Sequence, residues 1–344
     1  MCRSHYQRLA CGSLAVVLLL LAVPQVKAGI VIQANYEDSS SEGFYDQTSY
    51  NGSTLGAARR NAFEYALNIW GNALAPSYAG QTITIDAEFN PLGGDSSSAT
   101  LAQAGTETFR AVNGSTPLIY TDALANHVQG VDIEPGESEG FATFNSDIGG
   151  SALPTKSWYY GTDNNAGANE IDFVSTALHE IGHVLGFAGL MQSDGSYFDF
   201  SSTSLELYNQ YDYYVIRTSD GAILRNLSEA ERATAITNDD ISWGGTAGIA
   251  ANGGVAPKLY APSSWASGSS YSHLDESTFQ YELMSPLYTV GTQHEISALT
   301  MGMMVDMGWD SAIPEPGTLA VWSILAITAG LTRRRRGDFQ FLDA

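Results

Sequence analysis

Two histidines stand four residues apart in the segment His179-Glu180-Ile181-Gly182-His183. Apolar side chains recur at helical spacing through and around it, at Ile171, Val174, Leu178, Ile181 and Leu185. This period predicts a helix that begins near residue 171 and ends at Gly186, because glycine readily adopts the left-handed conformation that closes helices. Residues four apart project from one face of a helix, so both imidazoles can reach a single metal ion.

The residue types in this segment are those of a hydrolytic zinc site. Neutral imidazole suits Zn²⁺, and bound zinc lowers the pKa of a water to about 7. A carboxylate between the two histidines can take a proton from that water as it attacks a carbonyl. We therefore expect His179 and His183 to bind one catalytic Zn²⁺ and Glu180 to be the general base. A catalytic zinc normally has three protein ligands, so one more is required.

The segment also resembles the zinc motif of metzincin proteases, in which a third histidine follows at the position of Gly189. That histidine is absent here. The resemblance resumes at Ser272-His273 and at Glu282-Leu283-Met284-Ser285-Pro286. With this order of residues the chain is similar to leishmanolysin-type proteases, in which the third histidine follows a long insertion. It implies a zincin-like α+β fold with a mixed sheet, an active-site helix and a C-terminal subdomain with a methionine turn. In such a fold His273 would be the third zinc ligand and Met284 would lie beneath the metal.

Three other residues compete with His273 for the third place. Asp194 and Asp199 follow the motif closely, and carboxylates can bind zinc. His294 lies after the methionine turn, on the wrong side for the leishmanolysin-like order. His127 and His294 have no partner at ligand spacing and are expected to be solvated or hydrogen-bonded structural residues.

The first residues have the features of an export signal. Residues 1–28 contain two arginines, an apolar run at 14–23 and a small-residue pattern that ends at Ala28. A helix that spans a membrane needs about 20 apolar residues, so a cleaved signal peptide is expected rather than an anchor. Both cysteines, Cys2 and Cys11, lie within it, and the mature chain is expected to have neither a disulfide nor a thiolate ligand.

Residues 312–336 resemble the PEP-CTERM sorting tail of Gram-negative bacteria. Pro314-Glu315-Pro316 precedes an apolar stretch at 318–331, and four arginines follow at 333–336. The resemblance implies transient membrane contact, cleavage by an exosortase-type enzyme and an extracellular or cell-surface location. A permanent anchor is the alternative, since basic flanks can hold a short apolar segment at a membrane interface. Residues 337–344 form a final tail.

Residues 29–311 are expected to be the zinc metalloprotease domain, with an N-terminal subdomain to about residue 187 and a C-terminal subdomain at 188–311. The pattern before the motif predicts a helix and then several strands, which favours an α+β class over alternating βαβ units. These elements are a helix at 55–74 and strands at 81–89, 117–120 and 140–144. We expect the strand at 140–144 to be the edge along which a substrate lies.

The chain is acidic, with 37 Asp and Glu against 15 Lys and Arg and a formal net charge of −22. Phosphate groups are bound by clustered Lys and Arg, so neither nucleic acid nor an anionic membrane surface is expected as a partner. The segment Gly136-Glu137-Ser138-Glu139-Gly140 matches G-x-S-x-G in residue types, but it precedes the strand expected at 140–144 and does not lie between a strand and a helix, so it gives no support to a serine hydrolase. An extended polypeptide substrate is the expected partner.

These features predict a secreted zinc-dependent endopeptidase. Two alternatives stay open: a non-catalytic zinc-binding matrix or surface protein, and a zinc hydrolase that acts on a non-peptide or cell-wall bond. The first leaves the carboxylate of Glu180 without a use. Ca²⁺ is a further candidate at Asp163, Asn165 and Asn169, but Gly167 stands where an EF-hand loop has its fifth-position ligand, which favours a solvated loop.

Overall fold

The computed structural model describes residues 29–112, 118–198, 206–287 and 294–312. The predicted signal peptide, nearly all of the predicted sorting segment and the final tail lie outside the described residues. Within the described residues, no helix is both long enough and apolar enough to cross a membrane.

A mixed four-stranded sheet carries the fold. Its strands, in spatial order, are β1 (Val31–Tyr36), β4 (Thr82–Asn90), β8 (Gly140–Asn145) and β5 (Ala102–Thr106). The first three are parallel, and β5 is antiparallel to β8. Alternate residues of β4 from Ile83 to Phe89 are buried, which confirms the two-residue period expected there. Helices and a mixed sheet together confirm the α+β class.

The expectation that residues 140–144 form a sheet edge is wrong. These residues belong to β8, which lies between β4 and β5 and is buried along nearly its whole length. The edge beside it is β5, whose sequence Ala-Gln-Ala-Gly-Thr has no large alternating apolar residues and therefore no strand signal. Only pairing with β8 defines β5 as a strand.

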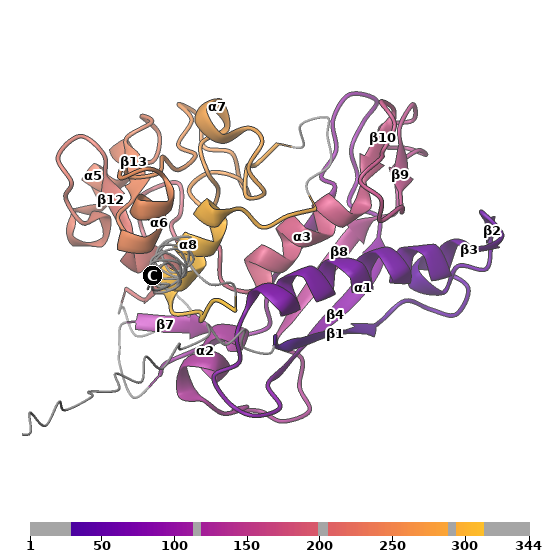
Figure 1. Cartoon of the computed structure of the whole chain (residues 1–344). Helices are drawn as coiled ribbons and strands as arrows, with labels where there is room; N and C mark the ends of the chain where they lie inside the picture. The colour runs from indigo at the N-terminus through magenta and orange to yellow at the C-terminus, as the bar shows by residue number, and fades with distance from the viewer. Residues whose placement is uncertain (1–28, 113–117, 199–205, 288–293, 313–344) are drawn as a thin grey trace, which may run out of the picture. The chain divides into compact units, whose positions relative to one another are not determined.

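Two helices, α1 (Leu55–Ala73) and α3 (Phe173–Val184), lie side by side on the sheet (Figure 1). The helix expected at 55–74 is confirmed. The indole Nε1 of Trp70 on α1 donates to the carbonyl of Leu178 on α3 at 2.9 Å. Gly140 lets α3 approach β8, since a Cβ there would lie 2.5 Å from Cγ1 of Val184.

Helix α3 begins two residues later than the apolar period indicates. Ile171 belongs to β10, and Asp172 caps the helix by accepting from the Ser175 N–H at 2.7 Å. The helix ends at Val184, Leu185 is its C-cap, and Gly186 follows with a φ of 110°. The end expected at Gly186 is therefore confirmed.

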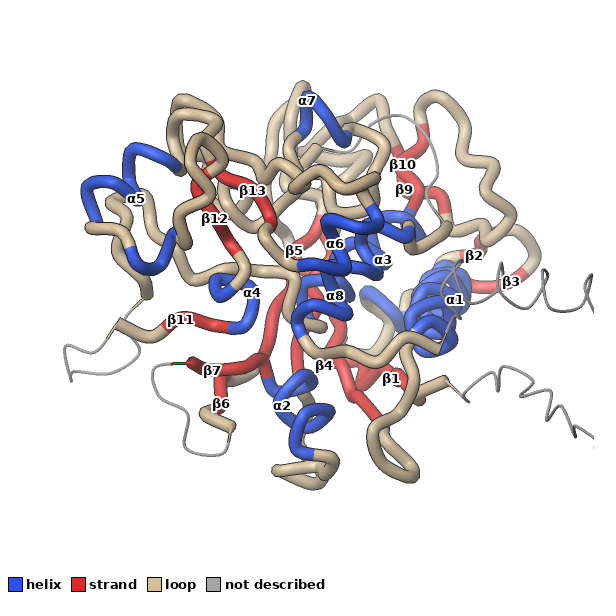
Figure 2. The backbone as a smooth tube through the Cα atoms, turned by 60° about the vertical axis from the view of Figure 1, so that its left-hand side comes forward, coloured by secondary structure: helices blue, strands red, loops and turns tan. Residues whose placement is uncertain are grey.

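The remaining elements are short and surround these layers (Figure 2). They are η1 (Gly43–Tyr45), β2 (Ser49–Tyr50), β3 (Ser53–Thr54), β6 (Phe109–Arg110), β7 (Leu118–Thr121), α2 (Asp122–Gln129), β9 (Ser157–Tyr159), β10 (Glu170–Asp172), β11 (Tyr208–Asn209), α4 (Gln210–Tyr213), β12 (Val215–Arg217), η2 (Leu224–Asn226), α5 (Glu229–Ala235), β13 (Ile241–Trp243), α6 (Thr246–Ala251), α7 (Glu276–Phe279) and α8 (Ala298–Met307). β11 pairs with β7, β12 pairs with β13, and α6 packs against α8.

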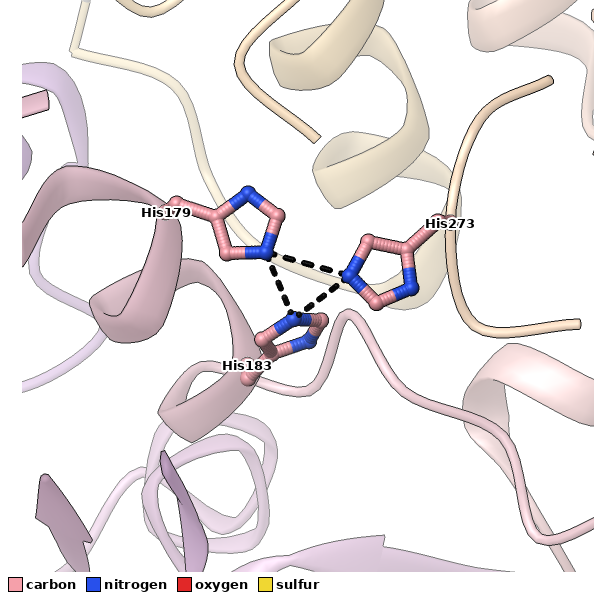
Figure 3. A group of neighbouring side chains, drawn as sticks. All are labelled: His179, His183 and His273. Atoms are coloured by element: carbon pink, nitrogen blue, oxygen red, sulfur yellow. Dashed lines mark hydrogen bonds between the residues drawn. The ribbon is translucent and has the colours of Figure 1, made fainter. Parts of the chain in front are cut away.

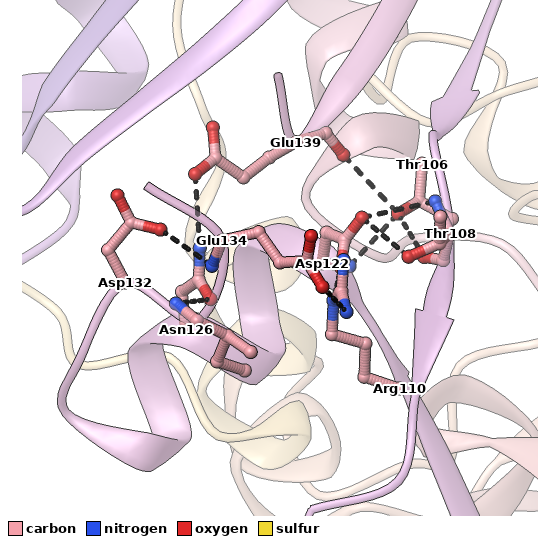
Figure 4. A network of polar contacts seen from close by, with 9 residues as sticks. Thr106, Thr108, Arg110, Asp122, Asn126, Asp132, Glu134 and Glu139 are labelled. Atoms are coloured by element: carbon pink, nitrogen blue, oxygen red, sulfur yellow. Dashed lines mark hydrogen bonds and ion pairs between the residues drawn. The ribbon is translucent and has the colours of Figure 1, made fainter. Parts of the chain in front are cut away.

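A polar network fixes the end of edge strand β5 against α2 (Figure 4). The Thr106 hydroxyl accepts from the Asp122 N–H at 2.9 Å. The buried Asp122 carboxylate accepts from the Thr108 hydroxyl at 2.8 Å and pairs with the guanidinium of Arg110. Arg110 also reaches Glu134 at 2.9 Å. The position of β5 at this end is therefore set by a charge pair that is largely removed from water.

Candidate metal site

The structure brings three histidines together. His179 and His183 lie one turn apart on α3, and His273 lies in a loop ninety residues further along the chain (Figure 3). Their Nε2 atoms are 3.1, 3.1 and 3.2 Å apart. Ligand atoms placed tetrahedrally at about 2.0 to 2.1 Å from zinc lie about 3.3 Å apart, so the triangle has the size that a zinc site requires. This group could hold a metal ion.

A backbone carbonyl orients each of the three rings through its Nδ1 atom. The acceptors are Leu283 for His179 at 2.7 Å, Phe187 for His183 at 2.7 Å, and Ser269 for His273 at 2.8 Å. A neutral imidazole that donates through Nδ1 keeps its lone pair on Nε2. The three lone pairs therefore face one point, and outer contacts of this kind are what orient metal ligands in proteins.

Burial keeps these rings in the form that binds metal. It lowers the pKa of His179, and together with the neighbouring His179 it lowers the pKa of His183 to about 3. Burial and the other two rings hold the pKa of His273 well below its usual value. Since the neutral imidazole is the ligand, the site is ready for a cation at neutral pH.

Glu180 lies between the two helical histidines in sequence but is not part of the group of converging ligand atoms. Its side chain is only 6% exposed, and burial raises its pKa to about 8. A cation held by the histidines would favour the ionised carboxylate, since opposite charge lowers a carboxyl pKa. Glu180 is therefore a buried carboxylate on the helix of two of the histidines, outside the group of converging ligand atoms.

Met284 packs against α3 at the level of the two helical histidines. It is fully buried, and a Cβ at Gly182 would lie 2.7 Å from its Sδ atom. The absence of a side chain at Gly182 thus makes room for the methionine. The preceding carbonyl, that of Leu283, is the one that orients His179. The turn at 282–286 supports the histidine group both by packing and by a hydrogen bond.

Two of the three competing residues, Asp194 and His294, lie in the described part of the chain and belong to other contacts. Asp194 is exposed and accepts from the Ser196 hydroxyl at 2.7 Å, whereas Asp199 lies outside the described residues. His294 contacts the carboxylate of Asp172 through Nε2 at 2.8 Å. The three histidines are the one group of three or more His, Cys, Asp or Glu side chains with converging ligand atoms in the described part of the chain.

Two further expectations concern residues away from this group. His127 is buried, contacts Gln81 at 3.2 Å and packs its ring against Trp309, so it is a hydrogen-bonded structural residue as expected. In the loop considered for Ca²⁺, the Asp163 carboxylate accepts from the Tyr159 hydroxyl at 2.5 Å. The solvated loop stays the prediction here, with Ca²⁺ as its alternative.

The site also contains features that its sequence pattern does not indicate. The carbonyls of Phe187 and Ser269 orient two of the histidines, but a carbonyl group is present at every position and gives no sequence signal.

A search of protein-family models found no match to the chain, and a search of curated proteins found none either. The geometry of the site is therefore the feature of this chain that bears on its function.

Proposed function

We propose that this chain is a secreted zinc-dependent endopeptidase with His179, His183 and His273 as zinc ligands and Glu180 as general base. One observation carries the proposal: three Nε2 atoms converge within 3.2 Å, and a buried carboxylate, that of Glu180, lies on the helix that carries two of the three histidines. A site built only to store metal has no need for that carboxylate. Three protein ligands also leave the fourth tetrahedral position open, as catalytic zinc sites do.

The chemistry divides between the metal and the chain. Zinc held by His179, His183 and His273 would supply a Lewis acid, which lowers the pKa of water to about 7 in such sites. Glu180 accepts a proton from the attacking water and later delivers it to the leaving amine. The carbonyls at Leu283, Phe187 and Ser269 keep the ligand rings in place throughout.

Substrate binding is assigned to edge strand β5. This strand contacts α3, and its outer side has no strand partner among the described residues. An extended peptide can add to such an edge through main-chain hydrogen bonds, which holds it largely independently of its side chains. A polypeptide added to this edge would lie beside the helix that carries Glu180, which supports a peptide over a compact substrate.

Export and processing belong to the same proposal and rest on the sequence alone. The signal at 1–28 would carry the chain out of the cytoplasm, and the segment at 312–336 would bring it briefly into the membrane before cleavage. The product would be an extracellular or surface protein of a Gram-negative bacterium.

Metal analysis of the purified mature protein, combined with casein digestion, tests the function directly. We expect about one zinc per chain, digestion that a chelator abolishes, and recovery of digestion when zinc is restored. Zinc without casein cleavage would support the non-catalytic alternative. Cleavage of cell-wall fragments without cleavage of peptides would favour the other zinc hydrolase.

A further inference from the structure

Direct contacts join the segment after α3 to the segment that carries His273. The Gly189 N–H donates to the Ser272 hydroxyl at 3.0 Å. Gly189 has no room for a side chain, because a Cβ there would lie 2.1 Å from Cε1 of Tyr271. Tyr271 is fully buried with a φ of 75°, a left-handed conformation that a bulky residue keeps only when its surroundings hold it there. The loop before His273 thus packs directly against Gly189 through Tyr271 and Ser272.

The short helix α4 and its N-cap bind both segments at once. Asn209 donates through Nδ2 to the carbonyl of Ala188 at 2.6 Å, and Asp212 accepts from the Leu190 N–H at 3.0 Å. On the other side, the Tyr211 hydroxyl donates to the carbonyl of Tyr271 at 2.8 Å. Asn209 and Asp212 also form a capping box, which satisfies two backbone N–H groups at the start of α4. In Figure 2, α4 lies close above β11.

We propose that α4 and Gly189 form a brace that sets the position of His273 relative to His179 and His183. Gly189 and Tyr211 are positioning residues in this brace, because they act on His273 through Tyr271 and Ser272. The inference rests on the metal site of the proposed function, but it requires only that the site binds zinc.

The brace solves a geometric problem of this chain. Two ligands come from one helix and keep their spacing as long as the helix is intact. The third arrives after ninety residues, and a ligand misplaced by about 1 Å loses the coordination geometry. In the shorter metzincin motif, position 189 would carry the third histidine itself. Here the same position receives the ring of Tyr271, so the turn after α3 still determines where the third ligand stands.

Zinc affinity of the full-length protein, measured by competition with a chromophoric chelator, tests the brace. Tyr211→Phe removes one hydroxyl and keeps the buried ring, so we expect about tenfold weaker zinc binding. This is the lower end of the loss in metal affinity, about 10- to 100-fold, that follows when a residue that orients a metal ligand is changed. Gly189→Ala should weaken binding at least as much, because it displaces Tyr271. Tyr213→Phe makes the same change at an exposed residue of α4, and Gly150→Ala is the control for the glycine. Neither control should change the affinity.

A double-mutant cycle separates positioning from general loosening. In a His273→Ala background, Tyr211→Phe should have no further effect on the residual zinc affinity, because the brace acts through His273. An equal loss in both backgrounds would overturn the proposal, and so would wild-type affinity in Tyr211→Phe. If Gly189→Ala does not fold, the Tyr211 cycle decides alone.

The same measurement separates the brace from the proposed function. A wild-type protein that binds no zinc would overturn both. A wild-type protein that binds zinc but cleaves no peptide would contradict the endopeptidase and leave the brace to be judged by the cycle.

Discussion

Glu180 carries its carboxylate in surroundings that disfavour charge. Burial raises its pKa to about 8, above the usual value of 4.5. A general base works best when its pKa lies near the operating pH, because it is then ionised yet still basic enough to take a proton. A bound cation would lower the pKa from 8 towards that range. The burial of Glu180 is therefore useful only if a cation is present.

Replacing Glu180 by Gln should abolish hydrolysis without loss of zinc. The amide has nearly the same shape but cannot accept the proton of the attacking water, and general-base catalysis contributes about 10²- to 10⁴-fold. Casein digestion and metal content are measured on the same preparation, with the exposed Glu134→Gln as the matched control. Retention of more than about a tenth of wild-type activity would remove Glu180 from the base role.

The histidine group should make the metal-free protein sensitive to acid. The folded pKa of His183 is about 3, below the usual 6.5, so the unfolded chain binds a proton that the folded chain excludes. Its contribution to stability is present above pH 6.5 and is lost as the pH falls towards 3. For one proton bound by the unfolded chain and not by the folded one, the unfolding free energy falls by about 1.4 kcal/mol for each pH unit of acidification.

Urea unfolding of the metal-free protein between pH 6 and pH 4 checks this dependence. His183→Gln should show a shallower fall in unfolding free energy than the wild type, by up to about 1.4 kcal/mol per pH unit. Parallel curves for the two proteins would show that His183 is not held neutral by burial.

The chemistry of the site could be predicted from the sequence only where it is local. His179, Glu180 and His183 lie on one helical turn, and the period of the helix alone places the two histidines on one face. His273 has no local relation to them, so its selection depended on a resemblance in residue order. The roles of Gly189 and Tyr211 depend on the path of the chain between these points and have no signal in their spacing.

At the scale of elements, patterning worked where one face of an element is buried. α1 and β4 were predicted because their apolar residues recur with the period of a helix or a strand. β5 was not, because its small residues are defined by pairing with β8. Because β5 was not predicted, β8 was taken as the edge of the sheet, although β5 lies beyond it.

The pair of Arg110 and Asp122 should stabilise the end of β5. Arg110→Ala would leave the carboxylate of Asp122, which is 4% exposed, without its cation. Breaking a fully buried pair costs about 3 to 5 kcal/mol, and Arg110 is partly exposed, so we expect a loss of about 2 kcal/mol. Glu134→Ala removes the exposed partner of the same guanidinium and should cost no more than about 0.5 kcal/mol. Equal losses in urea unfolding would contradict this assignment.

At the scale of the whole molecule, the two ends of the chain are expected to be removed. The signal should be cut after Ala28, and an exosortase should cut near residues 314–317. Intact-mass measurement of the protein secreted by a host that has the exosortase checks both ends. A secreted form that keeps the four arginines at 333–336 would show that the tail is not processed in this way.

Zinc should stabilise the folded state, because its proposed ligands lie on two segments distant in sequence, α3 and the loop at residue 273. A ligand present at a thousand times its dissociation constant stabilises the folded state by about 4 kcal/mol. For a chain of this size we expect the melting temperature to fall by roughly 8 °C when a chelator removes the metal. Differential scanning calorimetry with and without chelator measures the shift.

Variants of the candidate third ligands show whether the shift in melting temperature comes from zinc bound to His273. His273→Ala should lose most of the effect of the chelator, because two histidines bind zinc far more weakly than three. Asp194→Ala should keep the full effect, since Asp194 is exposed and bonded to Ser196. If the His273 variant still responds fully to the chelator while the Asp194 variant does not, the third ligand is a carboxylate and the assignment of His273 is wrong.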